Sequence, residues 1–228
     1  MPLEAYRQRR NFADTPEPVG RIQSRRYKQV FVVQKHAASH LHYDFRLEIG
    51  GVLVSWAVPK GPSMNPAEKR LAIRTEDHPL EYADFEGVIP EGEYGAGMVM
   101  VWDRGRYKSS DTLTLQAQLA RGKIDVVLQG EKLLGGFALV RVRTRASGRT
   151  RPEQWLLIKE RDDHADTAWS IESPELDRSV LSGRKMSDIA KGASPRKRAV
   201  PRNRPTPNRL SHCHLARKPS IASDSRNR

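Results

Sequence analysis

The chain has 228 residues, enough for one substantial hydrophobic core but hardly for two full domains. Its formal net charge is +13, yet residues 184–228 hold 13 of the 40 Lys and Arg residues and only 2 of the 27 acids, so residues 1–183 are nearly neutral. The single cysteine, Cys213, excludes a disulfide framework and a thiolate metal cluster. No apolar run reaches the length of a membrane span, and we expect a cytoplasmic monomer with no membrane contact.

The uneven charge bears on the partners that the chain can bind. A nearly neutral body binds a polyanion only through a local patch, whereas a basic tail adds a nonspecific, salt-sensitive attraction to nucleic acid. The tail, residues 184–228, contains five prolines and no aromatic residue. Such a segment cannot bury enough apolar surface to offset the entropy of ordering, so we predict that it is disordered.

At the other end, residues 1–27 are predicted to form an N-terminal arm. Two prolines within residues 6–18 argue against a helix across that segment. We expect the arm to lie over the body, anchored by Tyr6 and Phe12. The body itself is predicted to be one domain, residues 28–183.

The body consists mainly of short strand patterns separated by glycine and proline. Strands are predicted at residues 30–33, 40–49, 52–58, 70–75, 98–102, 124–128, 137–142 and 155–159. The Gly50-Gly51 pair between two of these strands predicts a hairpin. Many short strands joined by such turns favour a mainly β fold, an antiparallel barrel or sandwich.

One or two short helices complete the predicted fold. The first covers residues 111–122, with Asp111 as its N-cap and Gly122 after its last turn. The second is predicted at residues 175–181.

The strand predicted at residues 40–49 has an unusual polar face. Its apolar side chains alternate with those of His40, His42, Asp44, Arg46 and Glu48. His36 lies just upstream with the same parity. Imidazole and carboxylate are the usual ligands of divalent transition metals, and arginine binds phosphate through two parallel hydrogen bonds. The pattern leaves two interpretations open: a metal site beside a phosphate-binding arginine, or an ordinary solvated face.

Further polar candidates follow the third predicted strand. Residues 76–93 contain seven acids and no Lys or Arg, and their glycines and prolines predict an irregular loop anchored by Tyr82. Spacing alone does not bring Arg70, Glu76 and His78 to one site. Glu76 fits a solvated acidic loop equally well, and Tyr82 fits a core anchor as well as a catalytic role.

Several segments resemble the 3′-phosphoesterase domain of bacterial DNA ligase D. They are residues 34–36, 39–48, 55–62, 78–87, 89–97, 130–133 and 179–184, which include Ser-His-Leu-His-Tyr-Asp-Phe-Arg-Leu-Glu and His-Pro-Leu-Glu-Tyr-Ala-Asp-Phe-Glu-Gly. Because these motifs occur in the order found in that family, over roughly residues 6–190, the likeness is more specific than any one of them. No ligase or polymerase segment accompanies them, so the chain resembles a stand-alone member.

This resemblance implies a compact antiparallel β-barrel enzyme that heals the 3′ ends of broken DNA in non-homologous end joining. Members hydrolyse a 3′-phosphate and remove a 3′-terminal ribonucleoside from primer–template ends, with Mn²⁺ as the favoured metal. The implied metal ligands are His36, His42 and Asp44. The implied catalytic residues are Arg10, Glu17, Arg46, Arg70, Glu76, His78 and Tyr82. The implied substrate-binding residues are Gln34, Arg46, Lys60, Arg70 and His78. His40 matches no residue of the metal site, although its parity would allow it.

One departure from the family keeps a second function open. The family arm usually reads Arg-Asp-Phe, and here it reads Arg10-Asn11-Phe12, which removes a carboxylate. The chain could therefore be a catalytically weakened DNA-end-binding module that recruits repair partners, with a DNA ligase and Ku as the expected ones. A general metal-dependent phosphodiesterase acting on RNA or small phosphoesters is a further alternative. The balance between phosphatase and ribonuclease activity also stays open.

Overall fold

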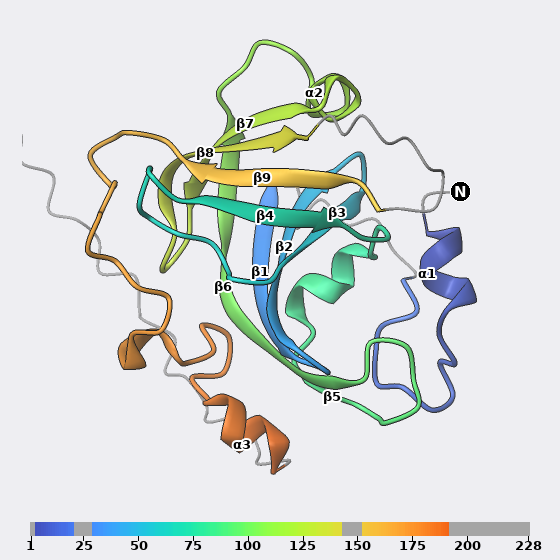
Figure 1. Cartoon of the computed structure of the whole chain (residues 1–228). Helices are drawn as coiled ribbons and strands as arrows, with labels where there is room; N and C mark the ends of the chain where they lie inside the picture. The colour runs from blue at the N-terminus through green and yellow to red at the C-terminus, as the bar shows by residue number, and fades with distance from the viewer. Residues whose placement is uncertain (1–2, 21–28, 143–151, 192–228) are drawn as a thin grey trace, which may run out of the picture. The chain divides into compact units, whose positions relative to one another are not determined.

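Nine β-strands form one continuous antiparallel sheet that closes on itself (Figure 1). A computed structural model describes residues 3–20, 29–142 and 152–191, all within one structural unit, residues 1–198. The strands are β1 Val30–Ala37, β2 Leu41–Ile49, β3 Val52–Val58, β4 Lys69–Arg74, β5 Gly87–Ile89, β6 Gly97–Ser109, β7 Lys123–Gln129, β8 Leu134–Arg141 and β9 Gln154–Lys159. The helical elements are α1 Glu4–Gln8, α2 Leu115–Arg121 and α3 Met186–Ala190, with 3₁₀ turns η2 Leu80–Asp84 and η3 Pro174–Leu176.

The order of strands in the sheet makes the fold a barrel. Strands β1-β2-β3-β4-β9-β8-β7-β6 are hydrogen-bonded in that sequence, and β6 also pairs with β1, which closes the ring. The thirteen-residue strand β6 is long enough to pair with β1, β5 and β7. Closure leaves these eight strands without a free edge, which is the physical advantage of a barrel over an open sheet. The predicted antiparallel β-barrel with few short helices is confirmed, and the sandwich is excluded.

Local sequence explains the best-predicted connections. Gly50 and Gly51 join β2 to β3 with φ of 65° and 86°, the left-handed conformations that a two-residue hairpin requires. Gly122 ends α2 with φ of 85°, as predicted. The predicted N-cap was wrong, because Thr114 caps the helix by accepting from the Ala117 amide. Asp111 instead accepts from the Leu113 amide in the preceding turn.

Other boundaries differ from the prediction for identifiable reasons. Strand β6 continues seven residues beyond its predicted end, where the charged residues Asp103 and Arg104 have partners within the fold: Asp103 accepts from the Leu133 amide, and Arg104 donates to Asp84 at 2.6 Å. Residues 76–93 are not wholly irregular, because they contain η2 and β5. No α-helix forms at residues 175–181, where only the 3₁₀ turn η3 occurs.

Both terminal segments contain helices that the sequence reading did not predict. The arm includes α1, and the segment assigned to the basic tail includes α3, whose Ile189 is buried against the barrel core. Residues 192–228 lie outside the described part of the chain, so the predicted disorder is not tested there. Among the described helices, none is long and apolar enough to cross a membrane.

Two hydrophobic clusters hold the fold together and place the site between them. The larger fills the barrel and includes Phe45, Trp56 and Trp102. The smaller packs on the outside of the barrel, where Tyr6 of the arm and Tyr82 of η2 lie 6.1 Å apart. Both faces of β2 are therefore covered along its middle, which excludes an ordinary solvated face at Asp44 and Arg46. The polar face of β2 is enclosed beneath the arm and η2, and this is the face that bears the candidate site.

Candidate active site

Three potential metal ligands converge on two adjacent strands. Strand β1 extends to Ala37, so His36 pairs directly with His42 of β2, and Gln34 pairs with Asp44. His36 Nδ1 lies 3.5 Å from Asp44 Oδ2, and His42 Nε2 lies 3.7 Å from Asp44 Oδ1. One donor atom from each of the three residues lies within 4.8 Å of the others. His40 is exposed and takes no part in this group, although its side chain was expected on the same face.

The second nitrogen of each imidazole fixes its orientation. His36 Nε2 lies 3.0 Å from the carbonyl oxygen of Gly95, and His42 Nδ1 lies 2.9 Å from that of His40. A carbonyl oxygen only accepts hydrogen bonds, so a neutral ring must carry its proton on the nitrogen that faces the carbonyl. The nitrogens facing Asp44 are then the unprotonated ones. This is the arrangement that metal-binding histidines have, and the donor set fits a divalent transition metal with coordination positions left open.

Asp44 is held in its ionised form beside this group. It is buried, which by itself would raise the pKa of its carboxyl, but the Arg46 guanidinium outweighs burial and holds that pKa well below its ordinary value. Arg46 Nη2 donates to Asp44 Oδ2 at 3.0 Å. A carboxylate is thus ready to accept a cation at any physiological pH.

Arg46 is fixed by acceptors on three strands. Besides Asp44, it donates to Gln34 of β1 at 2.8 Å and to Ser55 of β3 at 2.8 Å. Gln34 is fully buried and donates to the carbonyls of Tyr82 and Phe85, so it connects Arg46 to η2. Gln34 therefore fixes the orientation of the Arg46 guanidinium. The guanidinium itself lines a cavity of about 200 Å³.

His78 lies in the same cavity between two guanidinium groups. Its Nδ1 lies 2.8 Å from Arg46 Nη1 and 2.9 Å from the Glu76 carbonyl oxygen, and its Nε2 lies 3.2 Å from Arg10 Nη2. Burial, Arg46 and Arg10 together hold the pKa of His78 well below 6.5. The ring is therefore neutral and carries a single proton among its contacts with Arg46, Arg10 and the Glu76 carbonyl.

The N-terminal arm completes the cavity wall through a buried ion-pair network. Arg10 donates to Glu17 at 2.8 Å and to Glu76 at 3.2 Å. Tyr82 donates its hydroxyl to Glu17 at 2.9 Å, and burial, followed by the Glu17 carboxylate, raises the pKa of that hydroxyl well above 10. The Glu76 side chain is only 5% exposed, which excludes a solvated acidic loop at this position.

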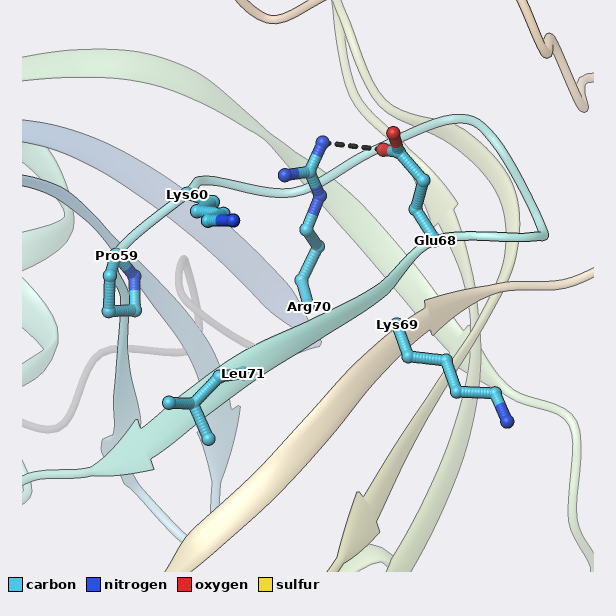
Figure 2. Close-up of a pocket in the computed structure, with 6 residues that line it drawn as sticks. All are labelled: Pro59, Lys60, Glu68, Lys69, Arg70 and Leu71. Carbon is cyan, nitrogen blue, oxygen red and sulfur yellow. Dashed lines mark hydrogen bonds and ion pairs between the residues drawn. The ribbon is translucent and has the colours of Figure 1, made fainter.

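The structure separates the candidate residues into three groups. Eight line the cavity: Arg10, His36, His42, Asp44, Arg46, Glu76, His78 and Tyr82. Gln34 and Glu17 contact these residues from behind. Lys60 and Arg70 line a different cavity of about 410 Å³, together with Lys69 and Glu68, and Arg70 donates to Glu68 (Figure 2). The Nε of Arg70 has no hydrogen-bond partner there.

Sequence reasoning missed several residues that line the main cavity or contact the residues lining it. Ser55 interrupts the apolar strand Val52–Val58, and this polar break was a usable signal. Gly95 contributes only its carbonyl, and Tyr94 lies beside it on the cavity rim. Asn11 does not line the cavity, since its side chain donates to Asp14 within the arm.

Comparison with known proteins identifies this arrangement. The sequence profile of the DNA ligase D 3′-phosphoesterase domain matches residues 34–141. Residues 34–141 belong to that family. This range contains β1 to β8, the potential metal ligands, Arg46 and His78, whereas Arg10 and Glu17 of the arm lie outside it.

Relatives of the 3′-phosphoesterase domain occur within much longer proteins. The chain is 50% identical over 166 residues to the multifunctional non-homologous end joining protein LigD of Pseudomonas aeruginosa, covering 72% of this chain and 19% of the relative. It is 46% identical over 155 residues to the multifunctional non-homologous end joining DNA repair protein LigD of Mycobacterium tuberculosis, covering 68% and 19%. The chain thus spans about a fifth of the length of these relatives.

Proposed function

We propose that this chain is a metal-dependent phosphoesterase that heals DNA 3′ ends in non-homologous end joining. It would hydrolyse a 3′-phosphate and remove a 3′-terminal ribonucleoside from primer–template ends. The observation that carries the proposal is that His36, His42 and Asp44 bring one potential ligand atom each together in the cavity that Arg46 and His78 also line. The family of residues 34–141 and the end-joining relatives support the same activity.

The residues have complementary tasks in this reaction. A divalent metal, which we propose to be Mn²⁺, would be held by His36, His42 and Asp44 and would screen phosphate charge and activate water. Arg46 presents a rigid fork that matches two phosphate oxygens. A phosphate anion that replaced Arg10 as the neighbour of His78 Nε2 would favour protonation of the ring, which could then donate a hydrogen bond to a phosphate oxygen.

The size of the cavity favours binding of the 3′ end of a DNA strand over binding of an internal nucleotide. A volume of about 200 Å³ takes a phosphate with its adjoining sugar but not a whole nucleotide. The rest of the DNA must lie outside. We propose that Lys60 and Arg70, in the second cavity, bind a phosphate of the strand farther from the terminus (Figure 2).

The non-catalytic alternative, an end-binding module that recruits partners, is not favoured. It depends on Asn11, whose side chain is exposed and contacts Asp14 rather than the cavity. A DNA ligase and Ku remain the proposed partners of an active enzyme.

His42→Ala and Asp44→Ala test the proposal. We expect wild-type protein to release inorganic phosphate from a 3′-phosphorylated primer–template and to shorten a primer that ends in a ribonucleotide, both only with Mn²⁺. Each variant should lose Mn²⁺ binding by calorimetry and both activities, since one ligand of three is removed. His40→Ala is the matched control, because His40 is exposed and outside the ligand group. Undiminished release by either site variant would refute the assignment.

A further inference from the structure

Tyr94 is an exposed aromatic side chain on the rim of the site cavity. It is 47% exposed, whereas Tyr82 in the same cavity is 2% exposed. Within residues 3–20, 29–142 and 152–191, no other aromatic residue is among the exposed large hydrophobic side chains. Core packing does not enclose this ring, so part of its surface beside the cavity is available to a ligand.

The hydroxyl group of Tyr94 is held by two polar side chains. Its hydroxyl oxygen accepts from Arg9 Nη1 at 2.8 Å, and the hydroxyl donates to Glu76 Oε2 at 3.4 Å. The next residue, Gly95, presents its carbonyl oxygen to His36 Nε2 at 3.0 Å. Tyr94 therefore stands one residue from a group that orients a potential metal ligand, and its ring is pre-ordered at the cavity mouth.

We propose that Tyr94 stacks on the base of the 3′-terminal nucleotide while the cavity holds the terminal phosphate. This inference rests on the proposed function and names how the same site recognises its substrate. The cavity, at about 200 Å³, leaves the base outside, next to the rim where Tyr94 lies. Stacking on an aromatic side chain tolerates any base, because every base has a π face.

Arg9 places a positive charge beside the Tyr94 ring. Its guanidinium carbon lies 5.0 Å from the centroid of the Tyr94 ring, and its side chain remains 47% exposed. A cation against an aromatic ring both stabilises the ring and attracts the polyanionic strand that the base belongs to. The rim thus combines an aromatic surface for the base with a cation for the backbone, independent of base identity.

The test is a fluorescence titration that needs no turnover. A primer–template that ends in 3′-phosphorylated 2-aminopurine is titrated with the full chain in EDTA, since stacking quenches this base. We expect quenching by wild-type protein and by Tyr94→Phe, which keeps the ring. Tyr94→Ala and Tyr94→Leu should lose the quenching and raise Kd about 5- to 100-fold. Leu134→Ala, at an exposed position on β8, is the control for the loss of an exposed apolar side chain.

A primer with an abasic 3′-terminal residue distinguishes two roles of Tyr94: stacking on the terminal base, and anchoring Arg9 of the N-terminal arm. Wild type and Tyr94→Ala should bind this primer equally if Tyr94 acts through the base. Equal weakening on normal and abasic ends, or a loss in Tyr94→Phe as large as in Tyr94→Ala, would overturn the inference and assign Tyr94 to anchoring Arg9. The proposed function fails separately: quenching without Mn²⁺-dependent phosphate release refutes catalysis while leaving the stacking contact intact.

Discussion

Arg46 shows at the residue scale why chemical identity, and not charge alone, defines the site. Its three donor nitrogens reach Gln34, Ser55 and Asp44 at 2.8–3.0 Å, which a planar guanidinium can do and an ammonium cannot. We expect Arg46→Lys to lower kcat for 3′-phosphate release by about 10²- to 10³-fold, as when one preorganised donor is removed from a developing anion. Steady-state kinetics with Mn²⁺ and a 3′-phosphorylated primer measures this effect.

The control for Arg46→Lys is Arg104→Lys, whose parent residue pairs with Asp84 and does not line the cavity. Thermal unfolding of both variants should show that each remains folded. If Arg46→Lys kept wild-type kcat, the fork geometry would be irrelevant and a diffuse positive charge would suffice.

The sequence predicted part of this constellation and missed part of it for a physical reason. Strand alternation placed His42, Asp44 and Arg46 on one face, because that relation is local. The pairing of His36 with His42 required knowing that β1 runs to Ala37. The contact of Tyr82 with Glu17 joins residues 65 positions apart, and no local pattern encodes it. The roles of the arm residues came from family resemblance alone.

At the scale of elements, one buried carboxylate organises the turn between β7 and β8. Asp103 of β6 accepts from the backbone amides of residues 104, 131, 132 and 133 at 2.8–3.2 Å. Gly130 completes the turn because a Cβ there would lie 2.4 Å from Asp103 Oδ2. Burial raises the pKa of Asp103 to about 6, although the hydrogen bonds from these amides act to lower it.

A pH-dependent stability follows from this carboxyl. Its pKa is 3.8 when unfolded and about 6 when folded, so the folded state binds more protons in between and loses stability as pH rises from about 4 to about 6. Asp103→Asn lacks this titration. We therefore expect the unfolding free energy of wild type, relative to Asp103→Asn, to fall by up to about 3 kcal/mol over that interval.

Urea unfolding of both proteins at pH 4, 5, 6 and 7 measures the difference. A difference that stays constant with pH would show that the carboxyl titrates normally. A difference that grows in favour of wild type would show that the four amides outweigh burial.

Element boundaries illustrate the same division between local and distant information. The hairpin at Gly50-Gly51 and the end of α2 at Gly122 were predictable, since backbone conformation there depends on glycine itself. The length of β6 was not predictable, because the partners of Arg104 and Asp103, which are Asp84 and the 130–133 turn, come near only in the folded chain.

On the scale of the whole molecule, residues 184–191 of the predicted basic tail contact the body, whereas residues 192–228 lie outside the described part of the chain. Helix α3 buries Ile189 against the barrel core, and Arg184 pairs with Glu86 at 2.9 Å. Residues 192–228 carry ten Lys and Arg residues and one acid, so nearly all of the excess charge follows α3. We therefore expect residues 184–191 to contribute to folding stability and residues 192–228 to contribute to the attraction of DNA.

Two truncations separate these contributions. Deleting residues 185–228 removes α3 and should lower the unfolding free energy by about 2 kcal/mol or more, the value of burying one large aliphatic side chain. Deleting residues 192–228 should leave the unfolding free energy unchanged but weaken primer–template binding at low salt and flatten the slope of log K against log salt, because fewer counterions are released. Turnover at saturating DNA should persist in the longer protein, residues 1–191.

Urea unfolding and fluorescence anisotropy at several salt concentrations measure both effects. If the 1–191 protein lost turnover at saturating DNA, residues 192–228 would be part of the catalytic site; an unchanged salt slope would show that their charge does not reach the DNA.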